Sequence, residues 1–376
     1  MTRRITLFAV ALILMTAWLP AAPYAQTPPA AAATGKPLRL AVAGLVHGHV
    51  RGFLSAAKKR TDVQIVGVFE PDTAVLKKYG QQFGYADNIL FTDLAKMLDE
   101  TKPDAVSTFT DTFDHPIVVE AAAQRHLTVM MEKPLAVSME HARRIQKAAQ
   151  QGNIQVIVNY ETSWYPSHGA IWNLVQEKKA LGDIRKMVAM DGHEGPKEIN
   201  VQPEFLNWLT DPQKNGAGAL FDFGCYGANL MTWLMNNQRP RSVTAMTARN
   251  KPAIYAKVDD EATILVQYEK AQGIMQASWN WPFGRKDFEV YGEKGLAIAT
   301  GGNNLRVRLP GEKAESTPTP EPLPANQHDS LSYLASVARG EQKSSGLSSL
   351  ENNMIVTEIL ESARESARTG RTVILK

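Results

Sequence analysis

The stretch RLAVAGLVHGHVRGF, residues 39–53, decides the fold of the N-terminal part of the chain. An apolar run over residues 40–43 reaches Gly44 and continues into a helical pattern, which is the strand–turn–helix arrangement of a phosphate-binding loop. In the G-x-G-x-x-G pattern of such loops, however, Val46 and His49 stand where the second and third glycines belong. The stretch therefore predicts the fold and leaves open whether the loop binds a dinucleotide.

Short apolar runs alternate with helical patterns in the residues that follow. This alternation is typical of parallel strands joined by right-handed helical crossovers. The expected strands lie within residues 38–44, 63–70, 104–110, 127–136 and 154–160, and the expected helices end at residue 59 or cover residues 73–83, 116–125 and 138–151. The sequence therefore predicts an α/β fold whose first domain, residues 37–158, is a doubly wound parallel sheet.

The pattern changes after residue 160. Apart from a helix over residues 167–179 and one after a glycine-rich turn, the apolar runs are separated by turn residues only, which favours an antiparallel sheet. A Pro- and Glu-rich loop over residues 311–327 precedes a last helix, residues 350–369, which could pack back on the first domain. We expect a C-terminal α+β domain, residues 159–376, with a mostly antiparallel sheet.

Residues 1–25 have a basic start, an apolar core and small residues before Ala25, which is the pattern of a cleaved signal peptide. The apolar core is short for a membrane span, although an uncleaved anchor is the alternative. Arg3 and Arg4 leave the Sec and the twin-arginine export routes both open. Residues 26–36 are rich in Pro and Ala and predict a disordered lead-in. We expect an exported, periplasmic protein with no membrane segment after cleavage.

The charge and cysteine content exclude several classes of protein. The formal net charge is +3, and it falls to +1 without residues 1–25 because Arg3 and Arg4 are lost and no acid is. A nearly neutral chain gives no electrostatic basis for binding nucleic acid or a membrane surface. Cys225 is the only cysteine, so the chain has no internal disulfide.

The turns after successive parallel strands meet at one edge of the sheet, where a ligand binds. Glu70 follows the second strand at a distance past Gly44 that suits a bond to ribose hydroxyls, and no adjacent Arg or Lys could hold a 2′-phosphate, which favours NAD over NADP. The alternative is an ordinary surface acid.

Within the glycine loop, Gly48 allows a close backbone approach, whereas Val46 does not offer the bare backbone that a pyrophosphate prefers. His47 and His49 either donate to phosphates or cap and pack under the following helix.

Two further motifs carry chemistry. Glu132, Lys133 and Pro134 follow an apolar strand, so the lysine is expected to point into the crevice. In GAGALFDFGCYGANLMTWL, residues 216–234, Asp222 and Tyr226 are four residues apart and share one face of a helix, with Asn229 one turn further. The alternative is a core tyrosine and an acid at a helix N-terminus.

These motifs resemble the Gfo/Idh/MocA family of NAD(P)-dependent oxidoreductases, and the resemblance covers residues 37–375. It extends to the stretch from 104 to 136, with His115 at the family's histidine and residues 110–113 at its cofactor-facing loop. The resemblance implies a Rossmann domain for the cofactor and a second domain for substrate and oligomerisation. It also implies cofactor contacts from the glycine loop, Glu70, Thr110, His115, Glu132 and Lys133.

The motifs together suit hydride transfer at a hydroxyl-bearing carbon. Lys133 would orient and polarise the hydroxyl, and Asp222 would hold the substrate or the lysine. Tyr226 would act as the acid/base, with its pKa lowered by the nearby ammonium. Since nicotinamide cofactor is scarce outside the cytoplasm, an exported enzyme of this kind is expected to retain its NAD tightly.

Aromatic side chains suggest the class of substrate. Trp279 and Trp281 alternate on an expected strand, so both face one side, and Trp164 lies near a loop. Aromatic faces stack on the C–H faces of sugars, which favours a sugar or polyol, although burial in the core is the alternative for each tryptophan. His193 lies where a strand leaves toward the site, and Asn229 is a further candidate for substrate binding.

No metal is expected. Residues 47–49 provide two histidines that are too close for both side chains to point the same way on a strand, and no other spacing offers three credible ligands.

The leading hypothesis is an exported NAD(P)-dependent oxidoreductase acting on a sugar or polyol. One alternative is a glycoside hydrolase that oxidises its sugar transiently, with His193 or Glu194 as acid/base. The other is a non-catalytic carbohydrate-binding protein. Because an open antiparallel sheet leaves a broad face to cover, a homodimer or homotetramer is expected.

Overall fold

The computed structural model describes residues 36–375. The predicted signal peptide and all but the last residue of the predicted lead-in therefore lie outside the described residues. Among the residues described, no helix has the length and apolar character that crossing a membrane requires.

Six parallel strands form the N-terminal sheet, in the order β3-β2-β1-β4-β5-β6. The strands are β1 (Leu38–Ala43), β2 (Val63–Phe69), β3 (Leu90–Phe91), β4 (Ala105–Thr108), β5 (Thr128–Glu132) and β6 (Val156–Asn159). The helices between them are α1 (Val50–Lys58), α2 (Thr73–Phe83), α3 (Leu94–Thr101), α4 (His115–Ala123) and α5 (Met139–Gly152). The predicted doubly wound parallel sheet is confirmed. The unit β3–α3 was not predicted, because a two-residue strand has no readable periodicity.

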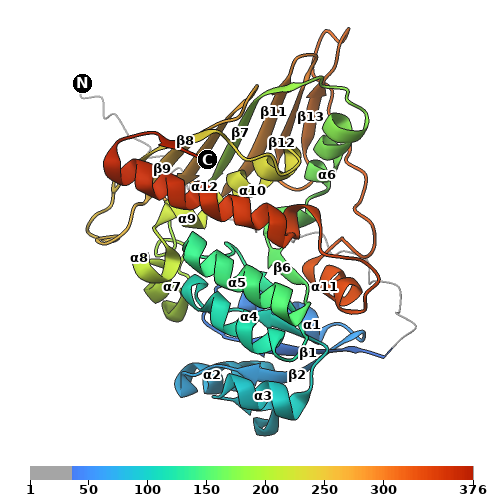
Figure 1. The fold of residues 1–376 in the computed structure, drawn as a ribbon, viewed down its shortest axis with the longest axis vertical. Helices are drawn as coiled ribbons and strands as arrows, with labels where there is room; N and C mark the ends of the chain where they lie inside the picture. Colours follow the sequence, from blue (N-terminus) through green and yellow to red (C-terminus); the bar gives the residue numbers. More distant parts are fainter. Residues whose placement is uncertain (1–35, 376) are drawn as a thin grey trace, which may run out of the picture. The chain divides into compact units, whose positions relative to one another are not determined.

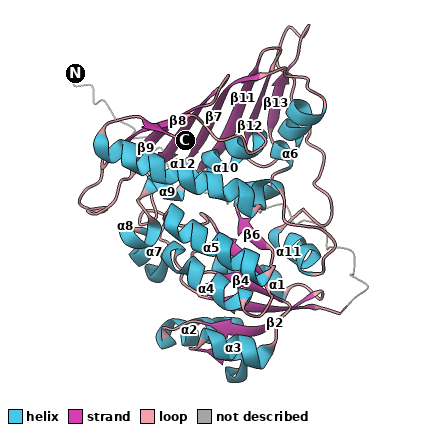
Figure 2. Cartoon of the chain, viewed as in Figure 1, coloured by secondary structure: helices cyan, strands magenta, loops and turns pink. Residues whose placement is uncertain are grey.

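The second sheet has eight strands, in the order β13-β12-β11-β7-β10-β9-β8-β14. Its strands are drawn in magenta in Figure 2. They are β7 (Ile184–Gly192), β8 (Ser242–Ala248), β9 (Glu261–Gln267), β10 (Gln272–Ser278), β11 (Arg285–Gly292), β12 (Leu296–Thr300), β13 (Leu305–Arg308) and β14 (Val373–Ile374). The β7–β10 pair is parallel and the other pairs are antiparallel. The prediction of a mostly antiparallel sheet in an α+β domain is therefore confirmed.

The remaining helices lie after residue 160. They are α6 (Pro166–Trp172), continued by the π-helical turn η4 (Asn173–Glu177), α7 (Pro203–Leu209), α8 (Pro212–Asn215), α9 (Ala219–Asp222), α10 (Gly224–Leu234), α11 (Ser330–Ala338) and α12 (Leu350–Thr369). Short 3-10 turns are η1 (Asp87–Ile89), η2 (Thr112–Asp114), η3 (Glu161–Trp164) and η5 (Gly346–Ser348).

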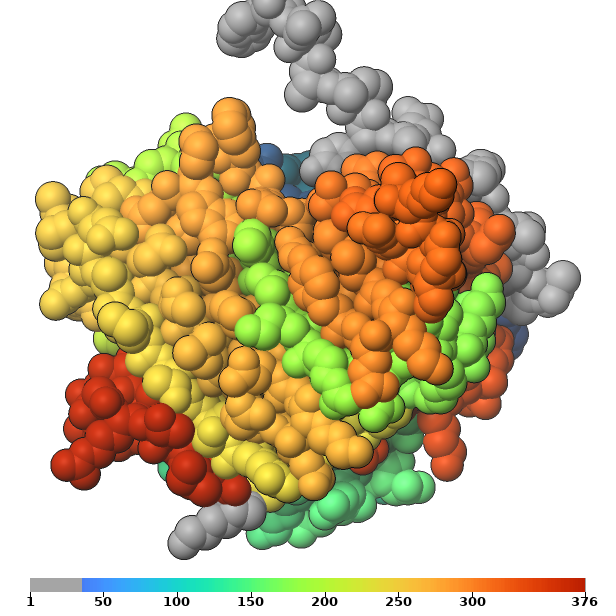
Figure 3. Space-filling model, turned by 90° about the horizontal axis from the view of Figure 1, so that it is seen from above, coloured from blue at the N-terminus to red at the C-terminus, as the bar shows by residue number. Residues whose placement is uncertain are grey.

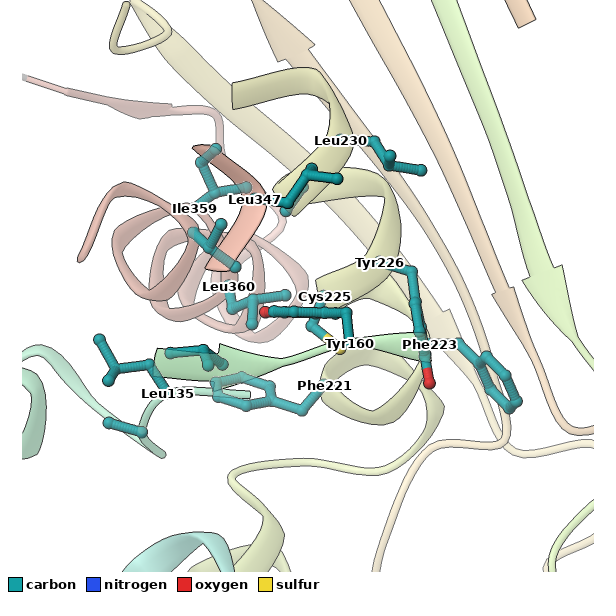
Figure 4. Close-up of a cluster of buried hydrophobic side chains, with 14 of the residues drawn as sticks. Leu135, Tyr160, Phe221, Phe223, Cys225, Tyr226, Leu230, Leu347, Ile359 and Leu360 are labelled. Atoms are coloured by element: carbon teal, nitrogen blue, oxygen red, sulfur yellow. The ribbon is translucent and has the colours of Figure 1, made fainter. Parts of the chain in front are cut away.

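The last helix joins the two sheets. Figure 1 shows α12 in red, running past α10 on one side and α5 on the other, and α12 also contacts β8 and β6. Arg364 of α12 donates from Nη1 to the backbone oxygens of Val137 (3.1 Å) and Gly216 (2.8 Å). Figure 4 shows the apolar cluster at this junction, where Leu360 of α12 lies close to Tyr160, which follows β6. The described part of the chain thus packs as one unit.

The strands of the second sheet have two different faces. Along β7, Met187, Ala189 and Asp191 are buried, while the side chains between them are partly exposed. The buried set faces α10, because a Cβ on Gly227 of α10 would lie 2.8 Å from the Cβ of Ala189. On the outer face, the side chains of β7 lie between those of neighbouring strands in the space-filling view (Figure 3). The inner face is therefore the one that can contribute to a site.

Candidate functional site

Gly44 ends β1 in a conformation that favours glycine. Its φ is +85°, and a Cβ at this position would lie 2.6 Å from the backbone nitrogen of Thr110, which follows β4. The loops that follow β1 and β4 are thus in close contact at this turn, which leaves no room for a side chain at Gly44. This places the loop after β1 against the predicted cofactor-facing residue Thr110.

Gly44→Ala is expected to destabilise the protein by about 2–4 kcal/mol, because the new methyl group meets backbone in a strained conformation. The free energy of unfolding in denaturant measures this. Gly52→Ala in α1 is the matched control, since no atom lies within 4 Å of its Cβ position, and it is expected to stabilise the helix by about 1 kcal/mol. A Gly44→Ala protein as stable as the wild type would contradict the tight packing of this turn.

The backbone N–H groups of the glycine loop are bound within the protein. The N–H of Leu45 donates to Glu70 Oε2 (2.8 Å), and the N–H groups of Val46 and His47 both donate to the carbonyl of Phe109 (3.1 and 2.9 Å). A G-x-G-x-x-G loop presents such groups to a pyrophosphate. The degenerate motif therefore corresponds to a loop whose backbone N–H groups at residues 45–47 are already hydrogen-bonded within the protein.

Helix α7 covers the other side of this loop. His47 is buried against Phe205 and Trp208, with ring centroids 5.1 and 5.6 Å apart, and the Trp208 indole donates to the Val46 carbonyl (3.1 Å). A Cβ on Gly48 would lie 2.9 Å from the Phe205 ring. Burial, followed by the charges of His49 and Lys133, holds the pKa of His47 well below its usual value. For His47, the structure therefore agrees with the alternative that the ring packs within the protein.

Glu70 lies at the end of β2, as predicted, and is buried. Its carboxylate accepts from the N–H of Leu45 and from that of Asp72 (3.1 Å). Burial raises the pKa of Glu70 in spite of these two bonds. Glu70 is therefore not an ordinary surface residue, and its predicted bond to a ribose stays a prediction.

A polar chain links the loops after β1, β5 and β6. His49, with 43% of its side chain exposed, contacts Glu132 (Nδ1 to Oε2, 2.9 Å). The other Glu132 oxygen accepts from Asn159 (2.8 Å), whose oxygen accepts from the Trp164 indole (3.0 Å). Trp164 also packs on Tyr333 of α11. The polar edge of Trp164 is therefore engaged within the protein. No pattern in the sequence pointed to Asn159 as the link.

His47, His49 and Glu132 lie within 4.8 Å of one another. The argument that the two histidines diverge on a strand was wrong, because residues 47–49 form a turn and the two rings are 4.8 Å apart. Hydrogen bonds account for the cluster: His49 Nδ1 faces Glu132, and His47 Nδ1 accepts from the His49 N–H (3.2 Å).

His115 begins α4 and is fully buried. Its Nδ1 lies 3.1 Å from the carbonyl of Leu135, whereas its Nε2 has no partner in the described part of the chain. Burial lowers the pKa of His115, so the ring is neutral. An unpartnered buried nitrogen in this crevice is a vacant site for a ligand's hydrogen bond.

Lys133 and Asp222 form a buried ion pair. Lys133 Nζ lies 2.6 Å from Asp222 Oδ1 and donates to the Asp222 carbonyl (2.9 Å). Asp222 Oδ2 accepts from the indole of Trp279 (2.9 Å). Burial opposes both charges, but the partners outweigh it, so the pKa of Lys133 is raised and that of Asp222 is lowered. Of the two predicted roles for Asp222, holding the lysine is the one this geometry supports.

Asp222 and Tyr226 do not share one continuous helix. Asp222 ends α9, Phe223 interrupts the helical path, and Tyr226 lies in the first turn of α10. The prediction of a single helix was wrong because the backbone at Phe223, with a φ of −108°, departs from regular helical geometry, and the four-residue spacing did not reveal this break. Lys133 Nζ nevertheless lies 5.0 Å from the centroid of the Tyr226 ring.

Tyr226 is buried beside Phe223 on the right of Figure 4, with Tyr160 edge-on to it at 5.6 Å. A second ammonium, Lys286 Nζ of β11, lies 4.7 Å from its ring centroid. Burial and nearby anionic groups, Glu161 foremost, raise the pKa of Tyr226 well above its usual value. The predicted lowering of this pKa is therefore wrong, and the phenol holds its proton at neutral pH.

The predicted substrate residues divide into two groups. His193 is half-buried at the site, with its ring edge-on to Phe223 at 4.9 Å, and burial lowers its pKa. Trp281 is partly exposed next to Gly192. By contrast, Trp279 is fully buried and holds Asp222, and both tryptophans lie beyond the end of β10.

Asn229 does not face the catalytic cluster. It is fully buried and donates to the Leu347 carbonyl (2.8 Å) and to Asn353 of α12 (3.3 Å). Its role in this structure is to hold α10 on the last helix. The core alternative therefore describes Asn229 and Trp279 better than substrate binding does.

Sequence reasoning missed Asp191, Lys286 and Glu161. Lys286 pairs with Asp191 in the register of β11 and β7, and its ammonium forms an ion pair with Glu161. One signal in the sequence could have found Asp191, because it is a carboxylate at a buried position in the alternating pattern of β7.

The residues present fit NAD at its two ends. Glu70 stands where the ribose of an adenosine binds, and the open Nε2 of His115 and the Lys133 ammonium stand in the crevice expected for the nicotinamide. Between them, the partly exposed side chain of His49 is a donor left for phosphates, because the loop's own N–H groups at residues 45–47 are engaged.

Family models match both halves of the chain. Residues 38–160 match the model described as oxidoreductase family, NAD-binding Rossmann fold, and residues 171–298 match the GFO/IDH/MocA C-terminal domain. The chain belongs to the Gfo/Idh/MocA family. It is an oxidoreductase with an NAD-binding Rossmann domain.

Individual relatives in the Gfo/Idh/MocA family are distant. The chain is 24% identical over 348 residues to a D-apiose dehydrogenase of Paraburkholderia graminis, covering 87% of each chain. It is 26% identical over 263 residues to a trans-1,2-dihydrobenzene-1,2-diol dehydrogenase of Xenopus laevis, covering 67% of this chain and 75% of that one.

Solved structures show the same fold. An aldose-aldose oxidoreductase from Caulobacter crescentus, complexed with glycerol, has a TM-score of 0.77 at 20% identity, covering 90% of this chain and 100% of that one. An inositol dehydrogenase homolog from Azotobacter vinelandii, complexed with NAD+, also has a TM-score of 0.77 at 20% identity, with 91% and 98% covered. These names give no support to the glycoside hydrolase or the non-catalytic alternative.

Proposed function

We propose that this protein transfers a hydride between NAD and a hydroxyl-bearing carbon of a sugar or cyclic polyol. The observation that carries the proposal is the buried Lys133–Asp222 pair, held beside the phenol of Tyr226 after the β5 strand. The relatives' names support the substrate class, since they include a D-apiose dehydrogenase, an aldose-aldose oxidoreductase and an inositol dehydrogenase homolog.

Each residue has one task in this reaction. Lys133, held by Asp222, donates a hydrogen bond to the reacting oxygen and stabilises the charge that develops on it. In reduction, the Tyr226 phenol donates its proton to the carbonyl oxygen of the substrate, and in oxidation its phenolate form accepts the hydroxyl proton. Trp279 fixes the Asp222 carboxylate, so that the lysine cannot swing away. NAD, when bound, would supply the acceptor or the donor of the hydride.

The purified protein is expected to carry stoichiometric NAD(H), because Phe205 and Trp208 cover the loop that faces the cofactor and export would favour a retained nucleotide. Protein purified without added cofactor is denatured, and the released nucleotide is identified by mass spectrometry. Release of NADP(H) instead would contradict the preference argued from Glu70. A protein that is empty and binds neither added nucleotide would contradict the whole proposal.

Turnover is tested with D-apiose, D-glucose, myo-inositol and glycerol, with NADH absorbance or product analysis as the readout. We also propose that the chain is exported to the periplasm through residues 1–25, which fractionation of cells expressing the full sequence tests. The dimer or tetramer stays a prediction.

A further inference from the structure

Asp191 is a buried carboxyl group without a partner. The residue is 2% exposed. Within residues 36–375, no donor forms a hydrogen bond or ion pair with its side chain. A buried carboxyl group that is not hydrogen-bonded is costly, so a native protein that keeps one calls for an explanation.

The position of Asp191 is on the wall of the proposed catalytic site. It lies on the face of β7 that packs on α10, two residues beyond Ala189, which abuts Gly227. Its partner in the sheet register is Lys286, and directly paired residues project from the same face. Because the Lys286 ammonium lies 4.7 Å from the Tyr226 ring centroid and both Lys286 and Lys133 act electrostatically on Asp191, Asp191 lies close to the Lys133–Tyr226 cluster.

Lys286 does not neutralise Asp191, because its ammonium is paired with Glu161. Burial raises the pKa of Asp191 well above its usual value, and the Asp287 and Glu161 charges act in the same direction against Lys286 and Lys133. A carboxyl group that holds its proton offers one O–H donor and a carbonyl acceptor.

We propose that Asp191 binds a second substrate hydroxyl, next to the one held by Lys133 and Tyr226, and so makes the site selective for vicinal diols. This inference rests on the proposed function. A carboxylic acid both donates to and accepts from a neighbouring hydroxyl, which an ionised side chain cannot do. The bound diol supplies the hydrogen-bond partner that the Asp191 carboxyl lacks within the protein.

The test uses the NAD-loaded protein and the sugar or polyol that it turns over fastest in the panel above. Asp191→Leu is expected to raise KM by about 10-fold, with bound nucleotide unchanged and the melting temperature unchanged or higher, because an apolar side chain removes an unpaired polar group. Asp191→Asn keeps a donor and an acceptor, so its KM stays within about 3-fold of wild type. Glu289→Gln, further along β11 on the opposite face of the sheet, is the matched control.

Selectivity is measured with trans-cyclohexane-1,2-diol and cyclohexanol as competitive inhibitors. The wild type is expected to bind the diol about 10-fold more tightly, and Asp191→Leu to bind both equally. If the Leu variant keeps the preference for the diol, or if the wild type shows no such preference, the inference is overturned. Turnover of a compound of the panel would still leave the proposed function standing. A lower melting temperature in step with lost activity would assign Asp191 a structural role. If no compound of the panel is turned over, the proposed function fails and the inference falls with it.

Discussion

Replacing Lys133 by methionine is expected to lower kcat by about 10²–10³-fold or more, while the protein still carries its NAD. Methionine keeps the length of the side chain and removes the ammonium that Asp222 positions 2.6 Å away. The reacting oxygen then loses its charged donor in the transition state. Turnover of the best substrate and nucleotide content by mass spectrometry are measured on the same preparation.

The control for this variant is Lys58→Met in α1, whose ammonium bonds only the carbonyl of Phe83 among the described residues. It should leave kcat unchanged. Turnover by Lys133→Met within a few-fold of wild type would remove the lysine from the mechanism. If nucleotide and turnover were lost together, the lysine would be needed for the fold or for cofactor binding, and not for the chemical step.

Tyr226→Phe is expected to lower kcat by about 10²–10⁴-fold, the usual effect of losing a general acid/base. Phenylalanine keeps the ring contacts to Tyr160 and Phe223 and removes only the hydroxyl. The melting temperature should therefore stay close to that of the wild type. Activity retained in the Phe variant would mean that another group at the site, such as His193, carries the proton.

The pH dependence gives a second test of Tyr226. Because its pKa is raised, the residue is protonated at neutral pH, so the oxidation rate should rise steadily with pH up to about 9.5. The reduction rate, which needs the phenol, should stay flat over the same range. In Tyr226→Phe the slope should disappear. A wild-type oxidation rate that levels off below pH 8 would contradict the raised pKa.

The titration of Tyr226 has a separate effect on folding stability, which does not interfere with the pH–rate measurement. A raised folded-state pKa means that the folded protein holds the proton more tightly than the unfolded chain. The resulting stability is fully present below the unfolded value of about 10 and is lost only as pH rises toward the folded pKa. Titration of Tyr226 therefore does not itself destabilise the protein in assays below pH 9.5.

Periodicity predicted the long elements because it is a local property. The helix bounds Thr73–Phe83 and Leu350–Thr369 agree with the prediction from sequence, since both segments have clear apolar spacing and capping residues. The strands β3 and β14 are two residues long and carry no such pattern. The break at Phe223 was also missed, because an i to i+4 spacing is the same in a continuous helix and in two short ones.

The residues of the candidate site were likewise predicted only in part. Lys133 was predicted because a polar motif directly follows a buried strand, and the crevice position follows from the parallel topology. Trp279 was misassigned, because an alternating pattern does not tell which face of a strand is covered, and the residue lies beyond the strand end. Its burial is decided by Asp222, which is 57 positions away in the chain.

The sequence by itself determined the doubly wound domain, the family motifs at residues 132–134 and 222–226, and the place of Glu70, because each depends on neighbouring residues and on strand order. Only the tertiary structure decided the rest. These features are the Lys133–Asp222 pair, the raised pKa of Tyr226 and the unpartnered carboxyl of Asp191. They arise where α9 and α10, packed on the second sheet, meet the segment that follows β5. Burial and charge at that contact depend on segments that are far apart in the sequence, so no local pattern encodes them.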